Sequence, residues 1–103
     1  MRKRSTKACD ISPAVRREVY NRDGGRCVIC GRTDVQTAHY ISRARLGLGI
    51  PENLALLCVS CHAEYDNGKL HHQIKNALKV YLQAKYEHWD ENKLIYRKDD
   101  TYD

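Results

Sequence analysis

Two pairs of cysteines and a histidine are the residues best suited by type and spacing to do chemistry. In chain order they are Cys27 and Cys30, Cys58 and Cys61, and His62. Four thiolates in two C-x-x-C pairs can close a tetrahedral shell around Zn²⁺, and a closed shell leaves no position for a substrate. The spacing therefore predicts a structural zinc site, with His62 held beside it and free for another task.

The segment between the pairs, residues 31–57, carries a second set of candidates: His39, Arg43, Arg45 and Asn53. A neutral imidazole near pH 7 can take a proton from water, so His39 suits a general base. The alternative is a histidine whose ring is satisfied by a backbone carbonyl. The guanidinium groups of Arg43 and Arg45 match phosphate oxygens, although a solvated loop explains them equally well.

Asp66 lies four residues after His62. On a helix these two side chains share a face, so together they could hold one divalent cation. The alternative is an ordinary acid near a helix end.

Three motifs in this order resemble the zinc-bearing form of the HNH endonuclease family. They are the first C-x-x-C pair, the run A-H-Y-I-S-R at 38–43, and the run N-L-x-x-L-C-x-x-C-H at 53–62. Residues 39–50 are also similar to small HNH proteins of bacteriophages and prophages. The resemblance covers about 26–68.

This resemblance implies a ββα-metal core, in which a β-hairpin and a helix hold one divalent cation. It implies that His39 is the general base and that His62 binds the catalytic cation. Asn53 would orient the base or steady the loop, and the four cysteines would hold the zinc. The catalytic cation is expected to be Mg²⁺, Mn²⁺, Ni²⁺ or Co²⁺. Imidazole is a soft ligand for Mg²⁺, so the other three suit the site better if few carboxylates help.

One position departs from the family pattern. Many HNH proteins carry a metal-binding Asp or His before the base, where this chain has Ala38. A second register is therefore open, with His39 as the ligand and Tyr40 as the base. Tyrosine has an ordinary pKa near ~10, which matches neutral pH poorly. His39 is the preferred base.

The composition suits a small basic domain. The chain has 103 residues, 18 Lys and Arg against 13 Asp and Glu, and a net charge of +5. Such a surplus favours a polyanionic partner such as DNA. We find no apolar run of membrane-spanning length and no secretory signal after the basic start. The fifth cysteine, Cys9, is unassigned, and paired thiols favour metal over disulfides in a reducing compartment.

The resemblance to the HNH family also carries the expected function and location. It implies a DNA-cleaving HNH enzyme in the cytoplasm of a bacterial host cell. The alternative is a non-catalytic zinc module that binds nucleic acid, or one associated with phage packaging proteins. The oligomeric state stays open.

We expect an α+β fold with a flexible basic arm over 1–10 and a single domain over 11–103. Ser12 and Pro13 predict a helix start, because a hydroxyl caps the first turn and proline suits the first helical position. Residues 35–41 are predicted to form a strand, and Ser60 is predicted to cap a helix from Cys61. Apolar spacing predicts a helix over about 72–86.

Overall fold

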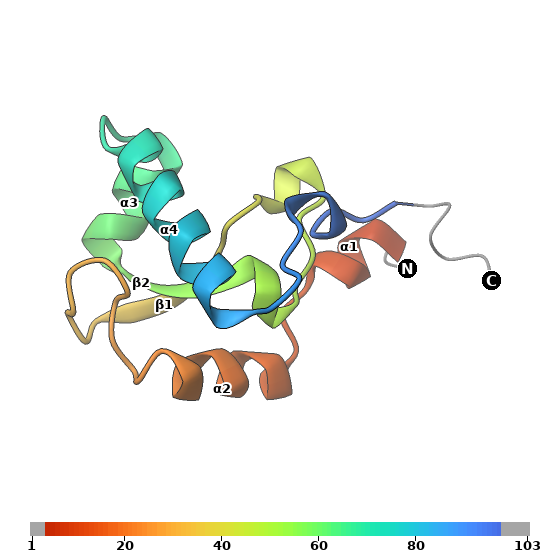
Figure 1. The fold of residues 1–103 in the computed structure, drawn as a ribbon, viewed down its shortest axis with the longest axis horizontal. Helices are drawn as coiled ribbons and strands as arrows, with labels where there is room; N and C mark the ends of the chain where they lie inside the picture. Colours follow the sequence, from red (N-terminus) through yellow and green to blue (C-terminus); the bar gives the residue numbers. More distant parts are fainter. Residues whose placement is uncertain (1–3, 98–103) are drawn as a thin grey trace.

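The computed structural model describes residues 4–97 (Figure 1). Its helices and strands are, in chain order, α1 (Arg4–Cys9), α2 (Pro13–Arg22), β1 (Val35–His39), the 3₁₀ turns η1 (Arg43–Arg45) and η2 (Pro51–Asn53), β2 (Leu54–Cys58), α3 (Val59–Asn67), α4 (His71–Lys85) and the 3₁₀ turn η3 (Glu91–Lys93). The predicted α+β class is thus confirmed. Within the described residues, every helix is too short or too polar to cross a bilayer.

A two-stranded antiparallel hairpin forms the centre of the fold. Val35 pairs with Cys58 at one end and His39 with Leu54 at the other. All five residues of β2 are buried. A continuous apolar run such as L-A-L-L-C is expected where both faces of a strand are covered.

Helices cover the hairpin on both faces. Leu54 and Leu56 of β2 pack with Val19 of α2, whereas Ala55 and Leu57 belong to the main core with the buried residues of α4. Figure 1 shows α2 below the hairpin and α4 on its other side. This alternation follows from the two-residue period of a strand and produces three layers.

The ends of the two longer helices agree with the sequence. Ser12 accepts a hydrogen bond from the Val15 N–H at 3.1 Å, with Pro13 as the first residue of α2. The helix predicted over 72–86 is confirmed as α4, one residue earlier at each end. Its buried residues, Ile74, Leu78 and Leu82, recur every four positions and form one apolar face.

Three local expectations need correction. The flexible arm over 1–10 is wrong for residues 4–9, which form α1 and end on the buried Cys9; residues 1–3 lie outside the described part. The strand predicted over 35–41 ends at His39, because the Asn53 side chain binds the Ile41 backbone in place of a strand partner. The helix predicted to start after Ser60 starts earlier, with Cys58 as its cap.

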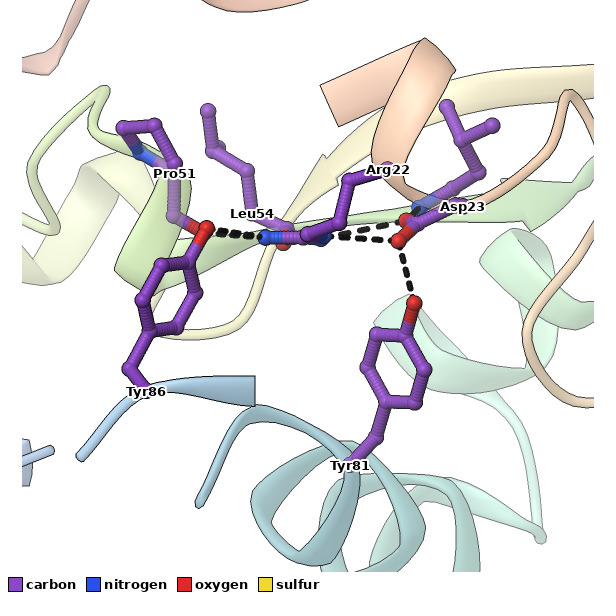
Figure 2. A network of polar contacts seen from close by, with 7 residues as sticks. Arg22, Asp23, Pro51, Leu54, Tyr81 and Tyr86 are labelled. Carbon is purple, nitrogen blue, oxygen red and sulfur yellow. Dashed lines mark hydrogen bonds and ion pairs between the residues drawn. The ribbon is translucent and has the colours of Figure 1, made fainter. Parts of the chain in front are cut away.

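A buried ion pair joins the end of α2 to the rest of the fold (Figure 2). Arg22 Nε lies 2.7 Å from Asp23 Oδ1, and the two side chains are 12% and 0% exposed. Arg22 also donates to the carbonyls of Pro51 and Leu54 and to the Tyr86 hydroxyl.

Asp23 completes the network from its other side. It accepts the Leu56 N–H at 2.9 Å and the Tyr81 hydroxyl of α4. Buried charges are tolerated where partners and hydrogen bonds satisfy them, as here. The network fixes the start of β2 between α2 and α4.

The residues after α4 pack back on the loop that joins the strands. The Leu48 N–H donates to the Leu94 carbonyl and the Tyr96 N–H to the Leu46 carbonyl, both at 2.8 Å. Leu94 is buried, and the indole of Trp89 donates to the Glu52 carbonyl. The loop is therefore held by residues distant in sequence.

Candidate active site and zinc centre

The four paired cysteines form one cluster. Their sulfur atoms all lie within 4.8 Å of one another, and Cys30 and Cys58 are 3.5 Å apart. Tetrahedral zinc with Zn–S bonds of about 2.3 Å would separate its sulfurs by about 3.8 Å. The cluster is thus sized for a single ion such as Zn²⁺, and all four thiols are free rather than paired in disulfides.

The thiols differ in their readiness to ionise. Burial opposes ionisation of Cys27, but backbone N–H groups of Cys30, Cys58 and Ile29 outweigh it and lower its pKa to about 7. Burial, followed by the neighbouring thiols, raises the pKa of Cys61. Four thiolates crowded together repel one another, so a bound cation is needed to stabilise them.

Cys58 connects the zinc cluster to the helix that follows. It ends β2, and its sulfur accepts the N–H of Cys61 at 3.4 Å as the N-cap of α3. A cap fixes the direction in which a helix starts. Because His62 lies in the first turn of α3, the cluster also fixes the histidine beside the hairpin.

His39 lies at the end of β1 with a defined ring orientation. Its Nε2 is 2.9 Å from the backbone carbonyl oxygen of Cys9. A carbonyl can only accept, so Nε2 carries the proton and Nδ1 keeps its lone pair. Burial is the main cause that lowers the pKa of His39, while the carbonyl opposes the change. The ring is therefore neutral at pH 7.

His62 is oriented through its other ring nitrogen. Its Nδ1 lies 2.6 Å from Gln36 Oε1, which leaves Nε2 toward Asp66 at 3.7 Å. The predicted sharing of one helix face by His62 and Asp66 is thus observed. An imidazole nitrogen and a carboxylate oxygen at this separation can both reach one divalent cation.

Both histidines line one cleft of about 650 Å³. Asp66, Arg43 and Arg45 line the same cleft, and residues of α4 and η3 also contribute to its lining. The rings therefore face a common space rather than opposite sides of the molecule. That space can admit a phosphate together with the chain that carries it.

The family comparison agrees with this geometry. Residues 27–68 match the family model described as HNH endonuclease. Over residues 27–68 the chain is thus of the HNH endonuclease type. The matched span holds both cysteine pairs, the hairpin and α3, and it confirms the resemblance drawn from the motifs.

A solved structure shares the fold of this chain. The chain superposes on the type IV phosphorothioation-dependent restriction endonuclease ScoMcrA with a TM-score of 0.62 and 24% identity. The superposition covers 72% of this chain and 16% of the restriction enzyme, so this chain spans a small part of that protein's length. No match was found among curated proteins.

Asn53, the middle residue of the HNH motif, lies outside the cleft lining and is fully buried. Its side chain accepts the Ile41 N–H at 2.8 Å and donates to the carbonyls of Ile41 and Leu48. Of the two expected roles, this geometry fits the one that steadies the loop. Its amide links the beginning and end of the segment that carries both arginines.

The two arginines in the loop between β1 and β2 differ in their surroundings. Arg43 donates to the Cys9 carbonyl at 3.1 Å and to Asp10 at 2.6 Å, and its side chain remains 46% exposed. Arg45 is exposed on the cleft lining. Both stay within reach of a polyanion in the cleft.

Tyr40, the alternative base, directly follows β1 and is buried, although it also contributes to the cleft lining. Its hydroxyl donates to Glu91 at 2.9 Å, and its ring packs edge-on against Trp89. Burial, followed by the contact with Glu91, raises its pKa far above neutrality. Its environment therefore opposes proton abstraction, whereas that of His39 favours it.

Sequence reasoning missed three contributors to the candidate site: the Cys9 carbonyl, Gln36 and the stacked pair Tyr65 and His71. The rings of that pair are 5.0 Å apart and nearly parallel. Gln36 lies in the predicted strand, but its residue type does not indicate that it would contact His62. A backbone carbonyl leaves no signal in residue type.

Proposed function

We propose that the chain is a divalent-metal-dependent endonuclease that hydrolyses DNA phosphodiester bonds, with His39 as general base. The observation that carries the proposal is that two histidines line one cleft and are each held through a different ring nitrogen, His39 through Nε2 and His62 through Nδ1. His39 offers Nδ1 for a proton, and His62 offers Nε2 for a cation. A non-catalytic zinc module has no use for this pairing.

The residues divide the reaction between them. His39 Nδ1 accepts a proton from water as the water oxygen bonds to phosphorus and the bond to the leaving oxygen breaks. His62, with Asp66, would hold the divalent cation, whose charge stabilises the phosphate and the leaving oxygen. Arg43 and Arg45 would bind phosphate oxygens and position the strand.

The missing ligand at Ala38 shapes the expected metal preference. Ala38 is buried in the core and cannot face a cation. The cation would therefore take His62, Asp66, water and substrate oxygens. With one imidazole among few protein ligands, we expect Mn²⁺, Ni²⁺ or Co²⁺ to support cleavage better than Mg²⁺.

A plasmid assay tests the proposal. Supercoiled DNA should be nicked or linearised with Mn²⁺ and remain intact with EDTA. We expect His39→Ala to reduce the rate by about 10²–10⁴-fold, the usual contribution of general base catalysis. His72→Ala is the matched control, because His72 is exposed on α4 and outside the cleft lining. A folded His39→Ala protein with an unchanged rate favours the non-catalytic zinc module.

A further inference from the structure

The backbone at Cys9 contacts two residues that the proposed reaction uses. Its carbonyl oxygen lies 2.9 Å from His39 Nε2 and 3.1 Å from Arg43 Nη1. The next residue, Asp10, binds the other arm of the same guanidinium at 2.6 Å. Cys9 and Asp10 lie outside the 27–68 span that matches the HNH family, whereas His39 and Arg43 lie inside it.

Gly49 of the loop holds this backbone at close range. Its N–H donates to the Ala8 carbonyl at 3.0 Å. A Cβ added at Gly49 would lie 2.0 Å from the Asp10 carbonyl oxygen and 3.0 Å from that of Cys9. Real Cβ atoms do not approach backbone so closely, so any larger residue must displace the Cys9–Asp10 segment.

The Cys9 side chain anchors the segment from the other side. It is 2% exposed, and burial raises the pKa of its thiol, so it stays neutral. An inward side chain and a glycine contact together fix where the carbonyl points. The carbonyl is thus a preorganised acceptor rather than a chance neighbour of the ring.

We infer that the Cys9 carbonyl is the positioning group for the base, an inference that rests on the proposed function. It holds the proton of neutral His39 on Nε2, keeps the lone pair on Nδ1, and fixes Arg43 beside the ring. Without this acceptor the imidazole can exchange tautomers and rotate. A base in the wrong tautomer or about 1 Å out of place loses orders of magnitude in rate.

Nitrogen-15 NMR of the zinc-loaded protein without a second cation tests the inference directly. Long-range proton–nitrogen correlations report which ring nitrogen of His39 carries the proton. The wild-type protein should show a single Nε2–H tautomer. A proton on Nδ1, or a mixture of tautomers, would overturn the inference whatever the cleavage activity.

Gly49→Ala tests the consequence for the reaction. We expect mixed tautomers at His39 and a loss of about 10²-fold in kcat, with KM changed much less. Gly24→Ala is the control, because a Cβ at Gly24 meets open space and the only penalty there is the backbone conformation (φ +67). It should leave tautomer and kcat unchanged.

The outcomes separate the two proposals. If Gly49→Ala keeps both the Nε2–H tautomer and the wild-type kcat, the positioning role is wrong while the nuclease proposal stands. If His39→Ala cleaves normally, the nuclease proposal is wrong even where the tautomer is Nε2–H. If Gly49→Ala fails to fold, the wild-type NMR result is the test: a single Nε2–H tautomer supports the positioning role, and a proton on Nδ1 or a mixture overturns it.

Discussion

Two arginine–aspartate pairs hold different parts of this molecule. Arg22 and Asp23 approach to 2.7 Å with side chains 12% and 0% exposed, whereas Arg43 and Asp10 approach to 2.6 Å with 46% and 28% exposed. The two nitrogen–oxygen distances are alike, but the side chains of the first pair are much more deeply buried. The buried pair joins three elements of the scaffold, and the open pair borders the cleft.

The comparison shows how one ion pair chemistry serves two purposes. In the scaffold every partner is supplied by the protein, so removing one leaves an uncompensated buried charge. At the cleft, water and substrate can replace a lost partner, so stability depends little on the pair. Scaffold variants should therefore affect folding, and cleft variants should affect the reaction.

The largest expected effect on the scaffold comes from the zinc cluster. Cys58→Ser should leave the chain unfolded at 25 °C, because structural zinc sites contribute about 10–16 kcal/mol in small domains, more than a typical folding free energy. Circular dichroism with metal analysis measures this. Cys9→Ala is the control, a buried cysteine outside the cluster, with an expected loss of about 1 kcal/mol. A folded, zinc-free Cys58→Ser protein would contradict the prediction.

Breaking the buried pair should have the next largest effect. Asp23→Asn keeps the shape but removes the charge that balances Arg22, so the free energy of unfolding should fall by about 3 kcal/mol. Urea denaturation measures this value. Asp34→Asn breaks the exposed pair with Arg32, where water screens both charges, and should lower the free energy of unfolding far less than Asp23→Asn does. Equal losses in the two variants would remove the distinction drawn from burial.

A smaller effect is expected from pH at the cleft. Burial, with help from Arg43, His62 and Arg16, lowers the pKa of His39 against the opposing Cys9 carbonyl. The cleavage rate should therefore rise with pH and level off below about 6.5, the ordinary value for histidine. The stability contributed by neutral His39 is complete above about 6.5 and is lost as pH falls through the lowered value.

Single-turnover rates at saturating Mn²⁺ measure this pH profile, and thermal melts measure the stability. A rate that still rises well above pH 6.5 would show that another group, or a metal-bound water, limits the reaction.

The smallest effect should come from the open pair. Asp10→Asn should lower the free energy of unfolding by about 0.2–1 kcal/mol, as expected for an exposed pair. The cleavage rate should nevertheless fall, because Arg43 loses one of two anchors while the protein stays folded. Parallel denaturation and cleavage assays check this. An unchanged rate would mean that the Cys9 carbonyl alone positions Arg43.

The sequence predicted the scaffold better than it predicted the cleft. Paired cysteines, the Ser12–Pro13 cap and the apolar period of α4 are local patterns with direct physical causes, and the structure bears them out. His39 and His62 were identifiable by type and motif.

The supports of these histidines were not predictable in the same way. The Cys9 carbonyl belongs to the backbone, which every residue has, and its approach depends on the glycine at 49. The Gln36 contact depends on how a helix start packs on a strand. Tertiary packing decided these contacts, so residue types alone carried no trace of them.

The three-layer arrangement has a consequence for anyone who would transplant the motif. Residues 27–68 contain every metal-binding candidate, yet the strand at their centre is covered by α2 and α4, which lie outside that span. An excised motif would expose Leu54 and Leu56 to water and would lack the oxygen that steadies the His39 ring. The portable unit for protein engineering is the whole described chain.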